Sequence, residues 1–131
     1  MLTFSKQSDY GLIIISQLLD KNEFIPLSEL IKNTNLPHRF LARIAAVLVS
    51  RKLLISREGR VGGYKLAPAV KTISVFDYLS IFEKHLSLLS CIHAKTKCKY
   101  EKVCRHKDNV HTKLNSIVLQ QLKSIKLLEL F

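Results

Sequence analysis

Residues 37–51 read PHRFLARIAAVLVSR, and their pattern predicts an amphipathic helix. At helical spacing one face is apolar, with Leu41, Ile44 and Leu48 in a row. Arg39 and Arg43 lie one turn apart on another face, with His38 beside them. A helix with an apolar core face and a cationic outer face can lie in a DNA major groove. An ordinary amphipathic helix with solvated arginines has the same pattern, so the flanking sequence must decide.

The residues before this stretch predict two further helices and a sharp turn. The first helix, Lys6–Asp20, carries an apolar stripe of Tyr10, Ile13, Ile14 and Leu18. Ser28 is placed to cap a short second helix, Ser28–Thr34. Asn35-Leu36-Pro37 then breaks the chain, and a proline suits the start of the next helix. Two helices joined by so short a turn, the second of them basic, predict a helix-turn-helix.

A β-hairpin is expected directly after the basic helix. Leu53–Ser56 and Tyr64–Ala67 have strand character, and the residues between them, Glu58–Gly63, are rich in glycine. A hairpin here makes a winged helix-turn-helix whose tip carries arginine and lysine for phosphates or the minor groove. The alternative is a solvent-exposed hairpin with ordinary charges. The predicted DNA-contacting residues are Ser28, His38, Arg39, Arg43, Arg57, Arg60 and Lys65.

Two helices are expected in the rest of the chain. Ser74 and Asp77 form a capping-box pattern that predicts a helix from Ser74 to about Leu89. The last helix, about Asp108–Leu128, has an apolar stripe made of Leu114, Val118, Leu122 and Ile125. Such a helix either packs on its own domain or pairs with its copy. Because DNA readers of this type bind two half-sites, we expect a homodimer.

These elements divide the chain into two functional regions that form one compact unit. Residues 1–73 hold the predicted winged helix-turn-helix. Residues 74–131 hold the linker helix, a cysteine-bearing loop and the dimerisation helix.

All of the cysteines lie in the loop Ser90–Lys107, with the spacing C-x6-C-x5-C: Cys91, Cys98 and Cys104. Three thiolates in one loop suit an iron–sulfur cluster or zinc, with a fourth ligand from elsewhere. The spacing contains no C-x2-C pair and so is not a zinc-finger pattern. Inert cysteines are the alternative. Three nearby histidines are either further ligands or surface residues: His93, His106 and His111.

The amino-acid composition limits the classes of partner that the protein is expected to bind. The 131 residues are 47% hydrophobic and 24% charged, as in a globular protein, and the net charge of +11 suits a polyanionic partner. No apolar run approaches the ~20 residues that span a bilayer, and no signal peptide is evident. We therefore expect a cytoplasmic protein without a membrane partner. No phosphate loop, carboxylate pair or nucleophile motif points to an enzyme.

The chain resembles the Rrf-type winged-helix regulators, the family of IscR, NsrR and RirA. The resemblance rests on the opening SKQSDYGL, the segment FLARIAAVL, the wing GRVGGYKLA, the helix start ISVFDYLSIFE, the three cysteines and the tail LNSIVLQQL. The cysteine spacing and the DYG start are most similar to the branch that regulates SUF-type iron–sulfur assembly. The resemblance implies a homodimer whose iron–sulfur cluster, 2Fe-2S or 4Fe-4S, is held by the cysteines and alters operator binding.

The chain departs from this family's pattern at several positions. The histidine that completes the cluster in IscR-like members is replaced by Lys107, and His106 lies one residue early. In NsrR-like members an aspartate of the partner's first helix is the fourth ligand, and Asp9 matches that position. The resemblance therefore ranks Asp9 of the partner subunit above His106. The usual Ala-Gly before the wing is Arg51-Lys52, so a relative's operator cannot be assumed.

A second function fits the same residues. A cluster-free repressor could use the cysteines for thiol chemistry with oxidants or nitrosative stress.

Overall fold

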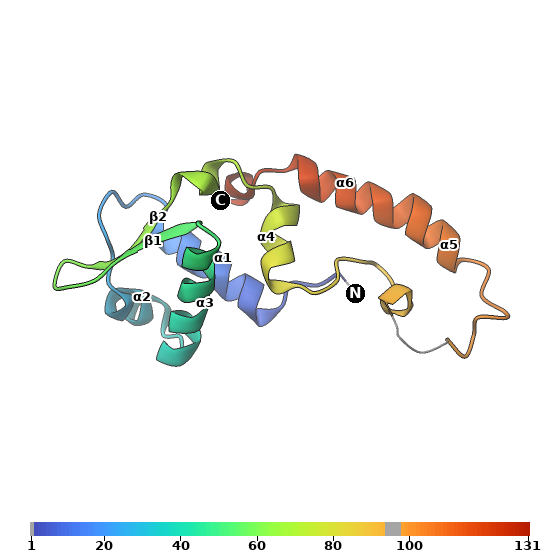
Figure 1. Cartoon of the computed structure of the whole chain (residues 1–131), viewed down its shortest axis with the longest axis horizontal. Coiled ribbons are helices and arrows are strands. Elements are labelled where there is room, and N and C mark those ends of the chain that lie inside the picture. The colour runs from blue at the N-terminus through green and yellow to red at the C-terminus, as the bar shows by residue number, and fades with distance from the viewer. Residues whose placement is uncertain (1, 94–97) are drawn as a thin grey trace.

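The computed structural model describes residues 2–93 and 98–131, which are mainly helical with a two-stranded antiparallel hairpin (Figure 1). In chain order the elements are α1 (Lys6–Leu18), α2 (Leu27–Thr34), α3 (His38–Ser50), β1 (Leu54–Arg57), β2 (Gly63–Leu66), η1 (Pro68–Lys71), α4 (Val75–Phe82), η2 (Ser90–His93), α5 (Lys107–Asn109), η3 (Val110–Asn115), α6 (Ser116–Ser124) and η4 (Leu127–Leu130). Figure 1 shows α1–α3 and the hairpin grouped together, with the continuous helix α5–η3–α6 extending away from them. The expected fold class, a winged helix-turn-helix followed by a long C-terminal helix, is confirmed.

The helix-turn-helix forms between α2 and α3. Asn35 ends α2 in the left-handed conformation (φ 57°), where its N–H donates to the Ile31 carbonyl at 2.7 Å. Asparagine tolerates this conformation better than most residues do, so the turn can be tight. Ser28 is not the N-cap of α2 as expected, because the helix begins one residue earlier with Pro26 in that position.

The core lies where α1, α3 and α4 pack together. The predicted face of α3 is buried, and Leu41 and Leu48 are fully enclosed. On α1 the predicted stripe is partly wrong, because Ile15 is buried while Tyr10 and Ile13 are only half-buried. The largest enclosed side chains are Tyr78, Ile14, Ile15, Leu18, Leu30, Leu41, Ile44, Leu48, Leu53, Leu79, Leu127 and Val70.

Helices α1 and α4 approach each other closely at Gly11. A Cβ on this glycine would collide with the hydroxyl of Tyr78, so the contact requires the missing side chain. The Tyr78 ring is fully buried, and its Oη donates to the Ser8 carbonyl at 2.6 Å. Burial and, secondarily, the Asp9 carboxylate raise the pKa of Tyr78, which keeps the hydroxyl protonated as a donor. This buried hydrogen bond fixes α4 against the start of α1.

The hairpin forms as predicted, but β1 lies one residue later and β2 one residue earlier in the chain than expected. Leu54 pairs with Leu66 and Arg57 with Gly63. Gly63 has φ 139°, and a Cβ there would collide with the Ile25 carbonyl. The close approach lets Ile25 and Tyr64 exchange two backbone hydrogen bonds of 2.9 and 2.8 Å. These bonds anchor the base of the wing to the segment before α2.

Helix α4 is shorter than predicted. Its N-cap is Ser74, as expected, and the Ser74 Oγ accepts from the Asp77 N–H at 3.1 Å. The helix ends at Phe82 and does not reach Leu89, because Glu83 turns extended and its carboxylate accepts hydrogen bonds from α1. A tertiary contact therefore overrides the apolar periodicity that continues beyond Phe82.

The last helix also ends early. It runs from Lys107 through the π-helical η3 to Ser124, whereas the sequence predicts about Asp108–Leu128. Ile125 and Leu127 form backbone hydrogen bonds of 2.9 Å with Val75 and Ile73. These bonds require extended backbone at Ile125, and they bring Leu127 into the core.

Lys52 occupies a conformation that favours glycine. Its φ is 61°, at the end of α3, where Lys52 and Leu53 donate to the Val49 and Leu48 carbonyls at 2.9 Å. This pair of bonds is the Schellman motif, whose left-handed residue is usually glycine.

We predict that Lys52→Gly raises the free energy of unfolding by about 0.5–1 kcal/mol, because relief of the left-handed strain exceeds the entropy cost of glycine. Urea denaturation followed by circular dichroism measures this change. The neighbouring Arg51→Gly is the control, since it removes the same charge from an exposed residue with φ −89°. Equal or lower stability of Lys52→Gly would show that the turn stores no such strain.

Candidate functional site

The exposed surface of α3 carries the predicted cations. His38, Arg39 and Arg43 are all exposed, while the apolar residues of the same helix face the core. Ser28 is exposed in the first turn of α2, the other helix of the motif. The helix-turn-helix therefore presents the residues that the sequence predicts for a polyanion.

Arg57 is held by contacts within its own chain. Its guanidinium lies 4.2 Å from the centre of the Phe24 ring, and its Nη2 donates to the Val61 carbonyl at 2.8 Å. The first contact ties the wing to the segment before α2, and the second closes the hairpin loop. The sequence did not single out Phe24, because nothing local indicates that an arginine so far along the chain would stack on it.

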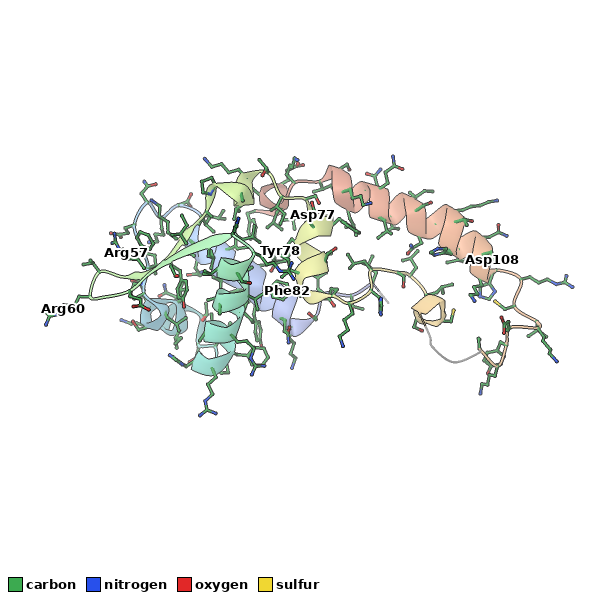
Figure 2. The ribbon with its side chains drawn as sticks, in the orientation of Figure 1. Arg57, Arg60, Asp77, Tyr78, Phe82 and Asp108 are labelled. Atoms are coloured by element: carbon green, nitrogen blue, oxygen red, sulfur yellow. The ribbon has the colours of Figure 1, made fainter. Side chains whose placement is uncertain are left out.

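The other two predicted wing residues lie in different places. Arg60 is exposed at the tip of the hairpin, and Figure 2 shows its side chain pointing away from the body of the protein. Lys65 is not at the tip as expected. It lies within β2, opposite Ile55, and is half-buried. Of the three, Arg60 lies at the tip, and its side chain makes no hydrogen bond, ion pair or ring contact with the described residues.

The three cysteines gather around one cavity. Cys91, Cys98 and Cys104 are free thiols that line a hollow of about 170 Å³ beside the start of the long helix. Residues 94–97 and the side chain of His93 lie outside the part of the chain that the structure describes. The spacing of the cysteines therefore brings them together in space, as the sequence indicates.

The two predicted fourth ligands, His106 and Asp9, differ in their position relative to the cysteines. His106 lies next to one thiol, with its Nδ1 3.9 Å from the Cys104 Sγ. Asp9 is exposed in the first turn of α1 and is absent from the cavity lining. Two acids that the sequence did not single out, Glu101 and Asp108, do line it. Figure 2 shows Asp108 at the beginning of the long helix.

The donor set around this cavity consists of three free thiols and two carboxylates. Among the described residues, no group of three or more histidine, cysteine, aspartate or glutamate side chains could hold one metal ion. The three cysteines line the same cavity. Cysteine thiolates arranged around a space are the ligands of iron–sulfur clusters.

Glu83 joins the region before the cysteines to α1. Its Oε1 accepts from the Ser5 N–H at 3.0 Å and from the Ser8 Oγ at 2.9 Å. Partial burial by itself would raise the pKa of Glu83, but these hydrogen bonds outweigh it and the pKa is lowered. The interaction is therefore present at neutral pH and is lost as the pH falls through the lowered pKa.

None of the helices in the described residues is both long and apolar enough to span a membrane.

The chain is similar to known transcriptional regulators over most of its length. The family described as "Rrf2: Iron-dependent Transcriptional regulator" matches residues 4–131. The HTH-type transcriptional regulator CymR of Bacillus subtilis (strain 168) is 27% identical over 125 residues, which are 94% of this chain and 91% of CymR. The HTH-type transcriptional regulator NsrR of Halalkalibacterium halodurans is 26% identical over 125 residues, 92% of this chain and 86% of NsrR.

Solved structures share the fold. The structure of CymR, described as the global cysteine regulator of B. subtilis, has a TM-score of 0.73 at 23% identity and covers 99% of this chain and 96% of that one. T. potens IscR has a TM-score of 0.65 at 23% identity, covering 98% and 85%.

These matches confirm the resemblance that the sequence motifs indicate, because the family match covers almost the whole chain. The relatives are regulators of transcription and not enzymes, as expected. The chain belongs to the Rrf2 family of transcriptional regulators.

Proposed function

We propose that this regulator binds operator DNA as a homodimer and that an iron–sulfur cluster on Cys91, Cys98 and Cys104 modulates its binding. The observation that carries the proposal is the meeting of three free thiols around one cavity, at the foot of the long helix. When bound, a cluster supplies a centre whose oxidation or loss changes the charge and the geometry of its ligands. The proposal extends to the cell compartment, which we take to be the cytoplasm.

The cysteine loop has a physical route to the DNA-binding region. The Leu88 N–H donates to the buried Asn115 Oδ1 at 3.0 Å, which links the segment before the cysteines to the long helix. Five residues earlier, Glu83 contacts Ser5 and Ser8 of α1. Helix α1 packs directly on α3. A ligand that orders the loop would therefore act on α3 through these contacts.

For the fourth ligand we propose Asp9 of the partner subunit, with His106 as the alternative. Asp9 does not line the cavity of its own chain, so its role requires a second copy of the protein. A carboxylate is a harder and weaker ligand for iron than a thiolate, which suits a centre that must be lost in order to signal.

Apolar side chains on the long helix support the dimer. Leu114 and Ile117, one turn apart, are 53% and 56% exposed. Leu122 and Ile125, which the sequence assigns to the same interface, instead pack against the core of their own chain. The predicted stripe therefore divides. We propose that Leu114 and Val118 of this stripe meet the partner, together with Ile117, which the predicted stripe does not include.

A cluster-free thiol sensor is the second candidate function. The proximity of His106 to the Cys104 thiol favours it, because a neighbouring imidazole promotes thiol reactivity. The relative CymR is described as the global cysteine regulator of B. subtilis.

Substitutions at Arg57 and Arg60 should affect DNA binding in different ways. Arg60→Ala should lower the slope of log affinity against log salt by about one, because one phosphate contact is lost, and Arg60→Lys should restore it. Arg57→Lys should behave like Arg57→Ala, since a lysine cannot reproduce the planar stacking and the bond to Val61. Fluorescence anisotropy with a duplex selected by the wild-type protein measures both slopes. An unchanged slope in Arg60→Ala would remove the tip from the interface.

The metal site yields a second prediction. After anaerobic reconstitution, replacing any one cysteine by alanine should abolish the visible absorbance, and Asp9→Ala should retain an unstable chromophore. His106→Ala, measured beside it, should resemble the wild type. Stable, full absorbance in Asp9→Ala with loss in His106→Ala would exchange the two roles. A colourless wild type with reactive thiols would favour the thiol sensor.

The dimer yields a third prediction. Ile117→Glu should produce monomers in sedimentation velocity, because it buries an unpaired charge at the interface. Ser116→Glu is the matched control, since Ser116 is exposed on a different face of the same helix. Dimers that persist in Ile117→Glu would place the interface elsewhere.

A further inference from the structure

A second cavity lies on the winged helix, away from the cysteines. Its volume is about 290 Å³, near the lower end of the range for small-molecule sites. The end of α1, strand β2, helix η1 and helix η4 all contribute to its lining. The cavity is therefore formed by segments that are far apart in the sequence.

The floor of this cavity is apolar and firmly held. Leu18 is fully enclosed and Val70 is 1% exposed, while Leu66 and Leu128 are half-buried. These side chains belong to the core or pack against it. Binding of a ligand with an apolar portion would remove this apolar surface from water, which is favourable in free energy.

The rim carries positive charge without a counter-charge. Lys21, Lys65 and Lys71 line the cavity, and its described lining contains no acidic residue. Among the residues that the structure describes, none of the three ammonium groups makes a hydrogen bond or an ion pair. Like charges that share a cavity repel one another, and an anion placed between them would relieve that repulsion.

The cavity and the helix-turn-helix lie on different faces of the hairpin. Successive residues of a strand point to opposite faces, and here Tyr64 and Lys65 line different cavities. The Tyr64 cavity includes Pro26 and Leu27 at the start of α2. Lys65 therefore lies on the face of the hairpin that is turned away from the helix-turn-helix.

We propose that this cavity binds a small organic anion that joins one carboxylate to a short apolar chain. The lysines would take the carboxylate and the leucine and valine side chains the apolar chain. Because Lys65 and Leu66 belong to β2, a bound anion would tie the wing to the end of α1 and to η4. This would be a ligand site independent of the cysteine loop.

Octanoate is the probe, followed by ¹H–¹⁵N correlation spectra of the full-length wild-type protein. Saturable shifts are expected in residues 18–22, 65–71 and Leu128, with weaker binding at higher salt. Inorganic phosphate tests the charge alone, and 1-octanol tests the apolar chain alone. Each should bind at least tenfold more weakly than octanoate. Equal binding of phosphate, or shifts that do not saturate or lie elsewhere, would overturn the proposal.

Paired lysine variants test the rim. Lys65→Gln/Lys71→Gln should raise the Kd for octanoate about threefold to tenfold. Lys32→Gln/Lys102→Gln loses the same charge at exposed positions outside the cavity and should leave the Kd unchanged. Equal weakening in both pairs would mean that net charge, not the cavity, attracts the anion. The wild-type shifts and their salt dependence decide the question even if a variant fails to fold.

Discussion

The close contact between α1 and α4 at Gly11 and Tyr78 determines how the two helices pack. Only a glycine leaves room for the Tyr78 hydroxyl, which bonds to the Ser8 carbonyl in a fully buried setting. A buried hydroxyl without a partner would cost about 1–3 kcal/mol, so the two helices have one favourable arrangement. Helix α3 also packs on α1, and the segment that leads to the cysteines begins at the end of α4.

This arrangement gives the cysteine loop a fixed starting point. Glu83, directly after α4, contacts the first turn of α1, and Leu88 contacts the long helix through Asn115. The return segment after that helix joins Ile73–Val75 through backbone bonds and places Leu127 in the core. Both ends of the C-terminal region are therefore attached to the winged helix. We propose that a change at the cysteines is transmitted to α3 through these contacts.

Local signals predicted the parts of the fold that depend on local interactions. The buried face of α3, the Ser74 cap and the hairpin follow from periodicity, capping and glycine placement. Both C-terminal helices were predicted too long, because Glu83 and Ile125 leave helical geometry to make contacts with distant segments. For the site, the position of the three cysteines in one loop predicted that they lie near one another, whereas the stacking of Arg57 on Phe24 depends on residues far apart in the sequence.

Differential alkylation of the wild-type protein shows whether the three cysteines hold a cluster. Iodoacetamide is added to the anaerobic iron-loaded protein and to the same sample after chelation, with iron and sulfide determined in parallel. We expect bound iron and sulfide, with Cys91, Cys98 and Cys104 all protected until the metal is removed. Full alkylation of the three thiols in the loaded sample, or no retained iron, would contradict it.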